Sequence, residues 1–151
     1  MQISRETEYA VRCIYFLARD PARVTGIDEM ARTLQIPRSF LAKILQKLAR
    51  EGFVRSTRGA RGGFRLAREP AAIRLYDIFV LTEGPAAADN GCAVSKAVCG
   101  LDGFCVLHPF WIKIRRDLTR LLKERTAAEL DVVSRYLKRI NPALTGRGGR
   151  S

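Results

Sequence analysis

Three of the four cysteines in this sequence lie close together, and its single histidine follows them. Six residues separate Cys92 from Cys99, five separate Cys99 from Cys105, and two separate Cys105 from His108. Three thiolates and one imidazole can complete a four-ligand metal site. In a reducing compartment, clustered cysteines are more often metal ligands or redox sensors than structural disulfides. The segment is therefore predicted to hold a metal centre or a thiol sensor.

The spacing of these residues leaves three kinds of site open. Structural zinc sites usually pair their ligands two to four residues apart, and only Cys105 and His108 are that close. Wider loops suit a larger inorganic body. Gly91, Gly100 and Gly103 would let backbone amides approach the sulfurs of an iron-sulfur cluster. On spacing alone, a cluster, a zinc ion and a bare thiol sensor are nearly equal alternatives.

A second set of residues with an evident chemistry is basic. The chain has 27 Lys and Arg against 15 Asp and Glu, which gives a formal charge of +12. Ten of the basic residues lie within residues 38–74, a segment that holds only two acids. Positive charge clustered in this way favours a polyanionic partner such as DNA.

Helices upstream of and within this segment are predicted to position the basic side chains. Apolar residues at helical spacing indicate helices at about 7–18, 27–34 and 37–50. The last two, joined by a tight turn, form the helix-turn-helix arrangement whose second helix enters a DNA major groove. The inward stripe of that helix is expected to comprise Phe40, Leu41, Ile44, Leu45 and Leu48. The residues left facing outward are Arg38, Ser39, Lys43, Gln46 and Lys47.

A basic hairpin is predicted next. Residues 53–57 and 64–67 have the composition of two strands, and the Gly-rich tip between them carries two arginines. Because no Walker lysine-hydroxyl pair or opening helix follows the glycines, a hairpin wing is favoured over a nucleotide-binding loop. We expect bases to be contacted by Ser39, Lys43 and Gln46. The residues expected to contact phosphates or the minor groove are Arg38, Lys47, Arg58 and Arg61.

The rest of the chain is predicted to be a helix, a long loop and a helical end. A short helix at 73–83 is expected to pack on the hairpin domain, and residues 86–108, which contain the clustered cysteines, show no periodicity. A long helix from Pro109 to about Arg125 has an apolar stripe of the kind that packs against a second subunit. A last helix is expected to run from a capping box at Thr126 to about residue 140.

Other functions and locations are disfavoured. No uncharged apolar run approaches the ~18 residues of a membrane span, and the N-terminus lacks the apolar core of a signal peptide. We therefore expect a cytoplasmic protein without a membrane partner. No Ser/His/Asp set or paired carboxylate motif is evident, so an enzyme is not expected. Cys13 lies on the apolar stripe of the first helix and is predicted to be a core residue. An iron-sulfur electron carrier would rarely need a basic winged helix.

The sequence resembles the winged-helix family of iron-sulfur transcriptional regulators that includes the cluster-assembly repressor IscR and the nitric-oxide-sensing repressor NsrR. The likeness runs from Met1 to about Leu130, and the three cysteines follow in the expected place. The stretches that carry it are Tyr9-Ala10-Val11, Ser39-Phe40-Leu41 through Leu48, Arg58-Gly59, Gly62-Gly63-Phe64 and Glu83-Gly84.

The resemblance implies a homodimer that binds operator DNA and acts as a repressor. Each recognition helix would enter a major groove and each wing a minor groove, with the cluster as the switch. The segment from Cys105 to Trp111 is similar to the IscR pattern, which makes His108 the fourth ligand of a 2Fe-2S cluster beside the three cysteines. Nitric-oxide sensors of the family can instead take an acidic ligand from the partner's first helix, where Glu8 stands. Glu8 is also explained as an acid that the helix dipole favours.

The sequence thus predicts a mainly α fold with a small β-hairpin wing, in the α+β class. The six-residue gap between Cys92 and Cys99 departs from the five of well-known family members. It leaves open a 4Fe-4S cluster, and redox state, iron or nitric oxide as the signal. The operator, the regulated genes and the DNA-binding form are also open. The expected parts are a winged helix-turn-helix domain (1–84), a cluster-binding loop (85–109), a dimerisation helix with a C-terminal helix (110–140), and a disordered tail (141–151).

Overall fold

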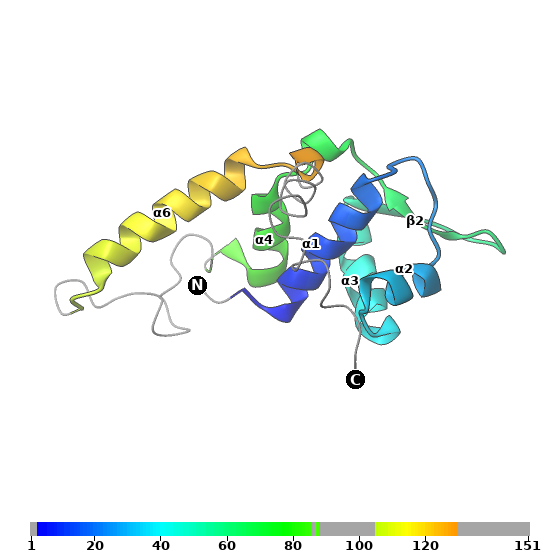
Figure 1. The fold of residues 1–151 in the computed structure, drawn as a ribbon, viewed down its shortest axis with the longest axis horizontal. Coiled ribbons are helices and arrows are strands. Elements are labelled where there is room, and N and C mark those ends of the chain that lie inside the picture. The colour runs from blue at the N-terminus through cyan, green and yellow to red at the C-terminus, as the bar shows by residue number, and fades with distance from the viewer. Residues whose placement is uncertain (1–2, 86, 88–104, 130–151) are drawn as a thin grey trace, which may run out of the picture.

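The structure is a computed structural model that describes residues 3–85, 87 and 105–129 (Figure 1). It has the predicted mainly helical architecture with one two-stranded antiparallel sheet. In chain order the elements are α1 (Arg5–Ala18), α2 (Ile27–Leu34), α3 (Arg38–Arg50), β1 (Val54–Thr57), β2 (Gly63–Leu66), the 3-10 helix η1 (Pro70–Ala72), α4 (Leu75–Glu83) and α6 (His108–Glu124).

Helix α1 packs against α2, α3, α4 and β2, and it supplies much of the core. Its fully buried side chains include Ala10, Cys13 and Ile14. The helix begins at Arg5, two residues before the predicted start, because Ser4 caps it: the Ser4 hydroxyl accepts a hydrogen bond from the Thr7 amide at 3.2 Å.

Helices α2 and α3 form the predicted helix-turn-helix. The turn between them passes through Gln35, whose φ of 53° is left-handed, and the Ile36 amide donates to the Ala31 carbonyl at 3.2 Å. The expected inward stripe of α3 is correct except for Phe40, whose side chain is 57% exposed. Phe40 lies in the first turn of α3 but to one side of the buried stripe, since Leu41 in the same turn is fully buried. The buried stripe consists of Leu41, Ile44, Leu45 and Leu48.

The wing is the hairpin of β1 and β2: β1 begins one residue later than predicted and ends at Thr57 as predicted, and β2 lies one residue earlier than predicted. Val54 pairs with Leu66 and Thr57 with Gly63. Thr25 adds a one-residue third strand, because it exchanges two 2.9 Å hydrogen bonds with Phe64. Gly63 has to be glycine there, since a Cβ would lie 2.3 Å from the Thr25 carbonyl oxygen. The close backbone approach therefore fixes the wing to the loop that precedes α2.

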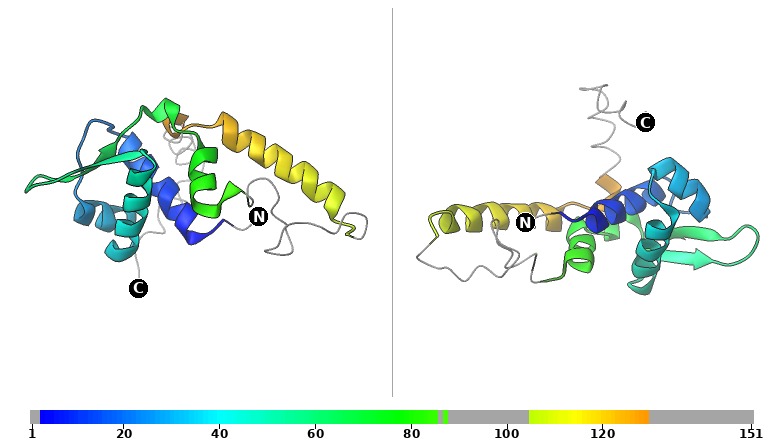
Figure 2. Two further views of the ribbon diagram at one scale, coloured as in Figure 1. Left: turned by 180° about the vertical axis from the view of Figure 1, so that it is seen from behind. Right: turned by 90° about the horizontal axis from the view of Figure 1, so that it is seen from below.

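Helices α4 and α6 start at other residues than predicted. Helix α4 begins at Leu75 rather than Ile73, because Arg74 pairs with Thr126 in an isolated bridge. The Leu75 amide donates to the Arg125 carbonyl at 3.0 Å, and this pairing ties the end of α6 back to the winged half. Helix α6 begins one residue early, at His108, with a proline in its first turn. Its His108 end lies far from the wing, and from there the helix runs back toward the winged half (Figures 1 and 2).

Several predicted features fall outside the described residues. They include Cys92, Cys99, most of the last predicted helix and the tail 141–151. Residues 127–129 are helical, and the Thr126 hydroxyl donates to a Glu129 carboxylate oxygen at 3.4 Å. None of the helices in the described part of the chain is both long and apolar enough to cross a membrane.

Candidate functional site

The outward face of α3 presents polar and basic side chains that have no competing partner. Ser39, Lys43 and Gln46 are exposed, and their side chains form no ion pair or hydrogen bond with another described residue. On a helix, positions 39, 43 and 46 share one face because they are four and three residues apart. The face can therefore donate to and accept from base edges in a major groove.

Two other predicted DNA contacts are engaged within the chain. The Arg38 Nε lies 2.7 Å from the Asp28 carboxylate, and both side chains are largely exposed. The Lys47 Nζ lies 2.6 Å from the Glu6 carboxylate on α1, and Lys47 is partly buried. Sequence reasoning missed both partners, since Glu6 is 41 residues from Lys47 along the chain.

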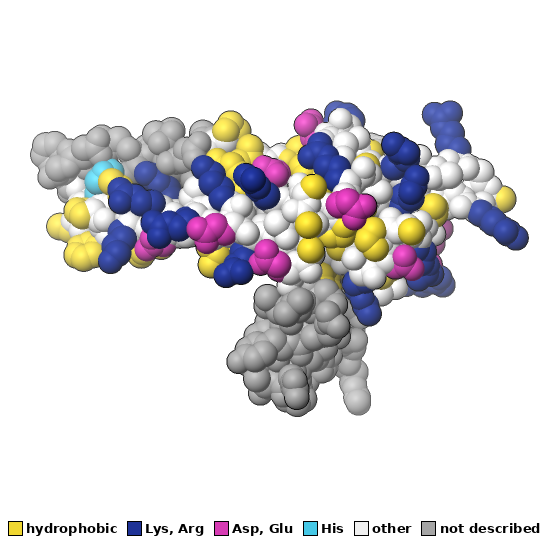
Figure 3. Space-filling view, turned by 90° about the horizontal axis from the view of Figure 1, so that it is seen from above, with side chains coloured by type: hydrophobic (Ala, Val, Ile, Leu, Met, Phe, Trp, Pro, Cys, Tyr) yellow, Lys and Arg dark blue, Asp and Glu magenta, His cyan; other side chains and the backbone are white. Residues whose placement is uncertain are grey.

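The tip of the wing carries exposed arginines. Arg58 and Arg61 flank Gly59, whose φ of 110° favours glycine. At the base of the wing, Arg68 donates to the Glu51 carbonyl at 2.7 Å, and its guanidinium lies 4.6 Å from the centre of the Phe53 ring. Arg68, which sequence reasoning did not single out, thereby fixes the end of α3 to the wing. Lys and Arg side chains lie on the wing and also along α6, where acidic side chains lie among them (Figure 3).

Cys105 and His108 meet at the start of α6. Cys105 is a free, partly buried thiol, and its carbonyl accepts a 3.0 Å hydrogen bond from the His108 amide. The turn thus places a thiol and an imidazole three residues apart at the N-terminus of α6. Among the described residues no three metal-ligating side chains come together. Because Cys92 and Cys99 lie outside that part of the chain, the complete ligand set stays a prediction.

Cys13 is a core residue, as predicted. Its side chain is fully buried, and burial raises the pKa of the thiol from 9.0 to about 12, although the charge of Arg12 lowers it. A thiol in this state stays neutral, so it is a poor ligand and a poor nucleophile.

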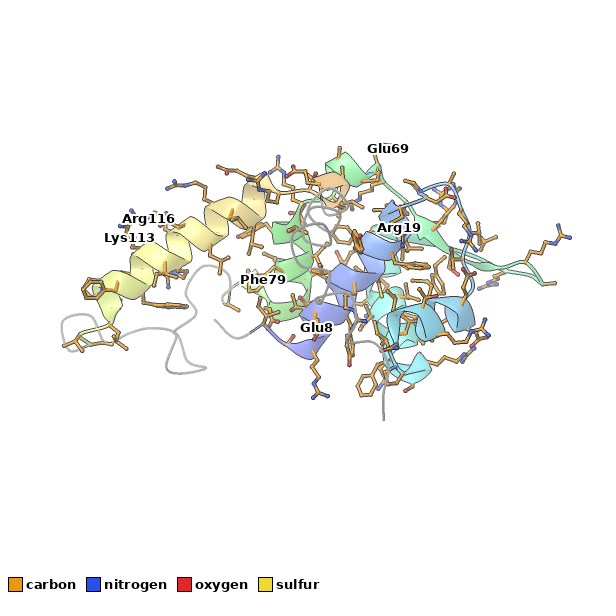
Figure 4. The ribbon with its side chains drawn as sticks, in the orientation of Figure 1. Glu8, Arg19, Glu69, Phe79, Lys113 and Arg116 are labelled. Carbon is orange, nitrogen blue, oxygen red and sulfur yellow. The ribbon has the colours of Figure 1, made fainter. Side chains whose placement is uncertain are left out.

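Glu8 is an exposed residue of α1 (Figure 4). Its carboxylate lies 3.3 Å from the Arg12 guanidinium, one helical turn away. Arg12 also donates to the Leu34 carbonyl at the end of α2. These contacts agree with a surface acid in the first half of a helix.

Glu83 joins the start of α1 to the end of α4, a role that sequence reasoning missed. Its carboxylate accepts hydrogen bonds from the Ser4 amide at 2.8 Å and from the Thr7 hydroxyl. Burial raises the pKa of Glu83, but the hydrogen bonds from Ser4 and Thr7, helped by the charge of Lys47, outweigh it and hold the pKa below 4.5. The only sequence signal near this contact was the spacing of Ser4 and Thr7, which is typical of a helix cap. The contact lies just before Gly84, which leads into the cysteine segment.

Comparison with known proteins gives one consistent family. Residues 3–132 match the Rrf2 family, described as iron-dependent transcriptional regulators. Protein aau3 of Rhizobium meliloti (strain 1021) is 35% identical over 130 residues, which cover 86% of this chain and 84% of the relative. The HTH-type transcriptional regulator NsrR of Bacillus subtilis (strain 168) is 27% identical over 140 residues, covering 92% and 88%.

A solved structure has the same fold. CymR, the global cysteine regulator of B. subtilis, matches with a TM-score of 0.71 at 27% identity, over 86% of this chain and 95% of that protein. The helix-turn-helix, the wing and the basic face of α3 are thus found in a chain whose family match spans all described residues. The chain therefore belongs to the Rrf2 family of transcriptional regulators, and its winged helix-turn-helix is a DNA-binding unit.

Proposed function

We propose that this chain is an iron-sulfur-cluster-dependent transcriptional repressor that binds operator DNA as a homodimer, with the state of the cluster as its switch. The observation that carries the proposal is the turn joining the free thiol of Cys105 to His108 at the start of α6. It stands in a chain whose family is described as iron-dependent regulators.

The proposed DNA contacts follow from exposure and charge. Ser39, Lys43 and Gln46 would contact base edges, and Arg58 and Arg61 would contact phosphates or the minor groove. Arg38 and Lys47 would exchange their carboxylate partners for phosphates. Exposed ion pairs contribute at most about 1 kcal/mol, so this exchange costs little.

The proposal of a homodimer rests on α6. No residue of this helix is buried, and Phe110 and Ile114 are 70% and 55% exposed. A helix that exposes large apolar side chains on one stripe gains stability when a second copy covers them. The family resemblance also implies that the cluster lies near this dimerisation helix.

The proposed cluster ligands are Cys92, Cys99, Cys105 and His108. The donors suit the group, since iron-sulfur clusters take thiolates and, at some sites, imidazoles. A 2Fe-2S cluster is favoured because His108 completes the set, and a 4Fe-4S cluster is the alternative. When bound, the cluster supplies a centre that gains or loses an electron or is dismantled by an oxidant. Cys105 and His108, at the N-terminus of α6, would pass that change to the helix.

An anaerobic purification with measurement of the visible spectrum, iron and sulfide tests the cofactor. We expect a coloured parent protein, a colourless Cys105→Ala variant, and a coloured Cys13→Ala control, because Cys13 is a buried core thiol. A colourless parent that contains zinc would contradict the proposal. A metal-free parent whose DNA binding responds to thiol oxidation would also contradict the proposal. That outcome would favour a thiol-based regulator, an alternative suggested by the likeness to a cysteine regulator.

The fourth ligand is tested by a second pair of variants. His108→Ala should alter the visible spectrum and speed cluster loss, whereas Glu8→Ala should do neither, since the Glu8 carboxylate pairs with Arg12. The reverse result would assign the fourth position to Glu8 of a second copy.

A further inference from the structure

Phe40 is exposed on the part of the molecule that faces DNA. Its side chain is 57% exposed, whereas Leu41 and Leu45 on the same helix are fully buried. No other aromatic side chain among described residues 3–85 is exposed. An isolated exposed apolar residue needs no explanation in general. The position of this one, on the first turn of a helix that reads DNA, is what singles it out.

The geometry of α3 places Phe40 beside the groups that read bases. It follows Ser39 directly and lies one turn before Lys43, so Cβ atoms of positions 40 and 43 are neighbours on the helix surface. In helix-turn-helix proteins the N-terminal residues of the second helix reach the base edges. Phe40 therefore enters the major groove when α3 does.

The chemistry of the groove limits what a phenyl ring can contact there. Phe has no donor or acceptor, so it gains nothing from phosphate oxygens or from the polar edges of guanine, cytosine or adenine. The C5-methyl group of thymine is the apolar feature that the major groove offers. Contact with it would remove apolar surface of both groups from water.

We propose that Phe40 contacts the C5-methyl group of a thymine and makes the protein prefer a T·A pair at one position of each half-site. This inference rests on the proposed role of α3 in reading operator DNA. Phe40 is then a determinant of specificity, whereas Arg58 and Arg61 of the wing mainly contribute affinity.

Replacement of thymine by deoxyuridine tests the contact, because it removes the methyl group and leaves base pairing and the O4 acceptor unchanged. The probe is the duplex that the parent protein selects from a randomised library, with binding followed by fluorescence anisotropy. We expect one thymine in each half-site whose replacement weakens parent binding roughly fourfold, the effect of exposing one methyl-sized group. Replacement of the other thymines should have little effect.

Variants of Phe40 test the same contact from the side of the protein. Phe40→Ala should weaken binding to the selected duplex on the order of tenfold and should no longer respond to the deoxyuridine. Phe40→Leu, which keeps an apolar side chain, should retain part of the response. Lys43→Ala is the control: it should weaken binding to both duplexes and keep the parent's response.

The outcomes separate this inference from the proposed function. If the parent selects a duplex and Lys43→Ala weakens binding, but Phe40→Ala responds to each deoxyuridine as the parent does, the Phe40 contact is wrong and the regulator stands. Equal binding of the parent to every deoxyuridine duplex would also overturn the contact. A parent that selects no duplex would overturn the proposed function and this inference together.

Discussion

The winged half of the chain is closed on itself, whereas helix α6 is not. Between Ala10 and Phe79 the winged half contains nearly all of the buried apolar side chains that the structure describes. Helix α6 buries none of its residues and exposes Phe110, Ile114 and Leu121. The difference teaches that one chain can build the DNA-reading surface alone, while the helix next to Cys105 needs an apolar partner.

The winged half and α6 also differ in how their polar side chains are bonded. Among the described residues, no buried side-chain nitrogen or oxygen lacks a hydrogen bond, and Glu83 and Arg68 close the two ends of the winged half. On α6, Lys113 and Arg116 lie on the outside of a projecting helix (Figure 4), although Lys123 packs over the Tyr76 ring of α4. Under the proposed function, a signal at the cysteine segment would act first on this less constrained part of the molecule.

The largest expected effect separates two isoleucines, one from each region. Ile14 is fully buried, so Ile14→Ala should lower the free energy of unfolding by about 2–5 kcal/mol at every protein concentration. Ile114 is 55% exposed in a single chain, so Ile114→Ala should cost little in dilute protein and progressively more where the dimer forms.

Urea unfolding at several protein concentrations, with sedimentation to measure the dimer, checks this pair. A cost of Ile114→Ala that equals that of Ile14→Ala in the monomeric range would contradict the division of the molecule into a closed and an open region.

A second test asks whether the wing belongs to the closed region. Gly63→Ala places a Cβ 2.3 Å from the Thr25 carbonyl oxygen, so we expect a loss of about 1–3 kcal/mol in unfolding free energy and weaker DNA binding. Gly26→Ala is the matched control, because no atom lies within 4 Å of its Cβ position. The control should cost less than about 1 kcal/mol. Similar costs for the two variants in thermal melts would show that the wing is not fixed to the loop before α2.

The sequence was sufficient for what depends on local pattern. Helical periodicity predicted α2 and the buried stripe of α3, and the family likeness that rested on the α3 and wing residues was confirmed. Phe40 was wrong because it lies to one side of the stripe that contains Leu41 and Leu45, and periodicity does not tell how wide a strip of the helix the core covers.

The remaining differences depend on contacts that are distant in sequence. Pairing of Thr25 with Phe64, and of Arg74 with Thr126, sets the position of the wing and the start of α4, and no local pattern encodes either. The same holds for the Lys47–Glu6 pair. Roles of Cys92 and Cys99 stay predictions, because those residues lie outside the described part of the chain.

The third prediction concerns the closure by Glu83. Hydrogen bonds from Ser4 and Thr7 hold the folded-state pKa of Glu83 below 4.5, so its stabilisation is fully present above that pH and is lost as pH falls through the folded pKa. Glu83→Gln should lower the unfolding free energy by on the order of 1 kcal/mol at neutral pH, because Glu83 is only partly buried.

The difference between parent and Glu83→Gln should shrink as the pH falls below 4.5, as measured by urea unfolding over a series of pH values. Glu51→Gln is the control, since the Glu51 side chain is exposed and forms no bond with another described residue. A Glu83→Gln deficit that persists unchanged in acid would show that the carboxylate charge does not carry the closure.

The smallest expected effect concerns Lys47, which is proposed to contact DNA although it lies in the closed region. Glu6 holds Lys47 at 2.6 Å, and this pair links α1 to α3. Glu6→Gln should lower the unfolding free energy by about 0.2–1 kcal/mol, the contribution of an exposed pair. It should also raise DNA affinity by up to about fivefold, because Lys47 no longer gives up a carboxylate to reach a phosphate. In a Lys47→Ala background the gain should disappear. If Glu6→Gln instead raises affinity equally in both backgrounds, only the loss of a negative charge near DNA matters, and Lys47 belongs to the packing of the winged half rather than to its DNA surface.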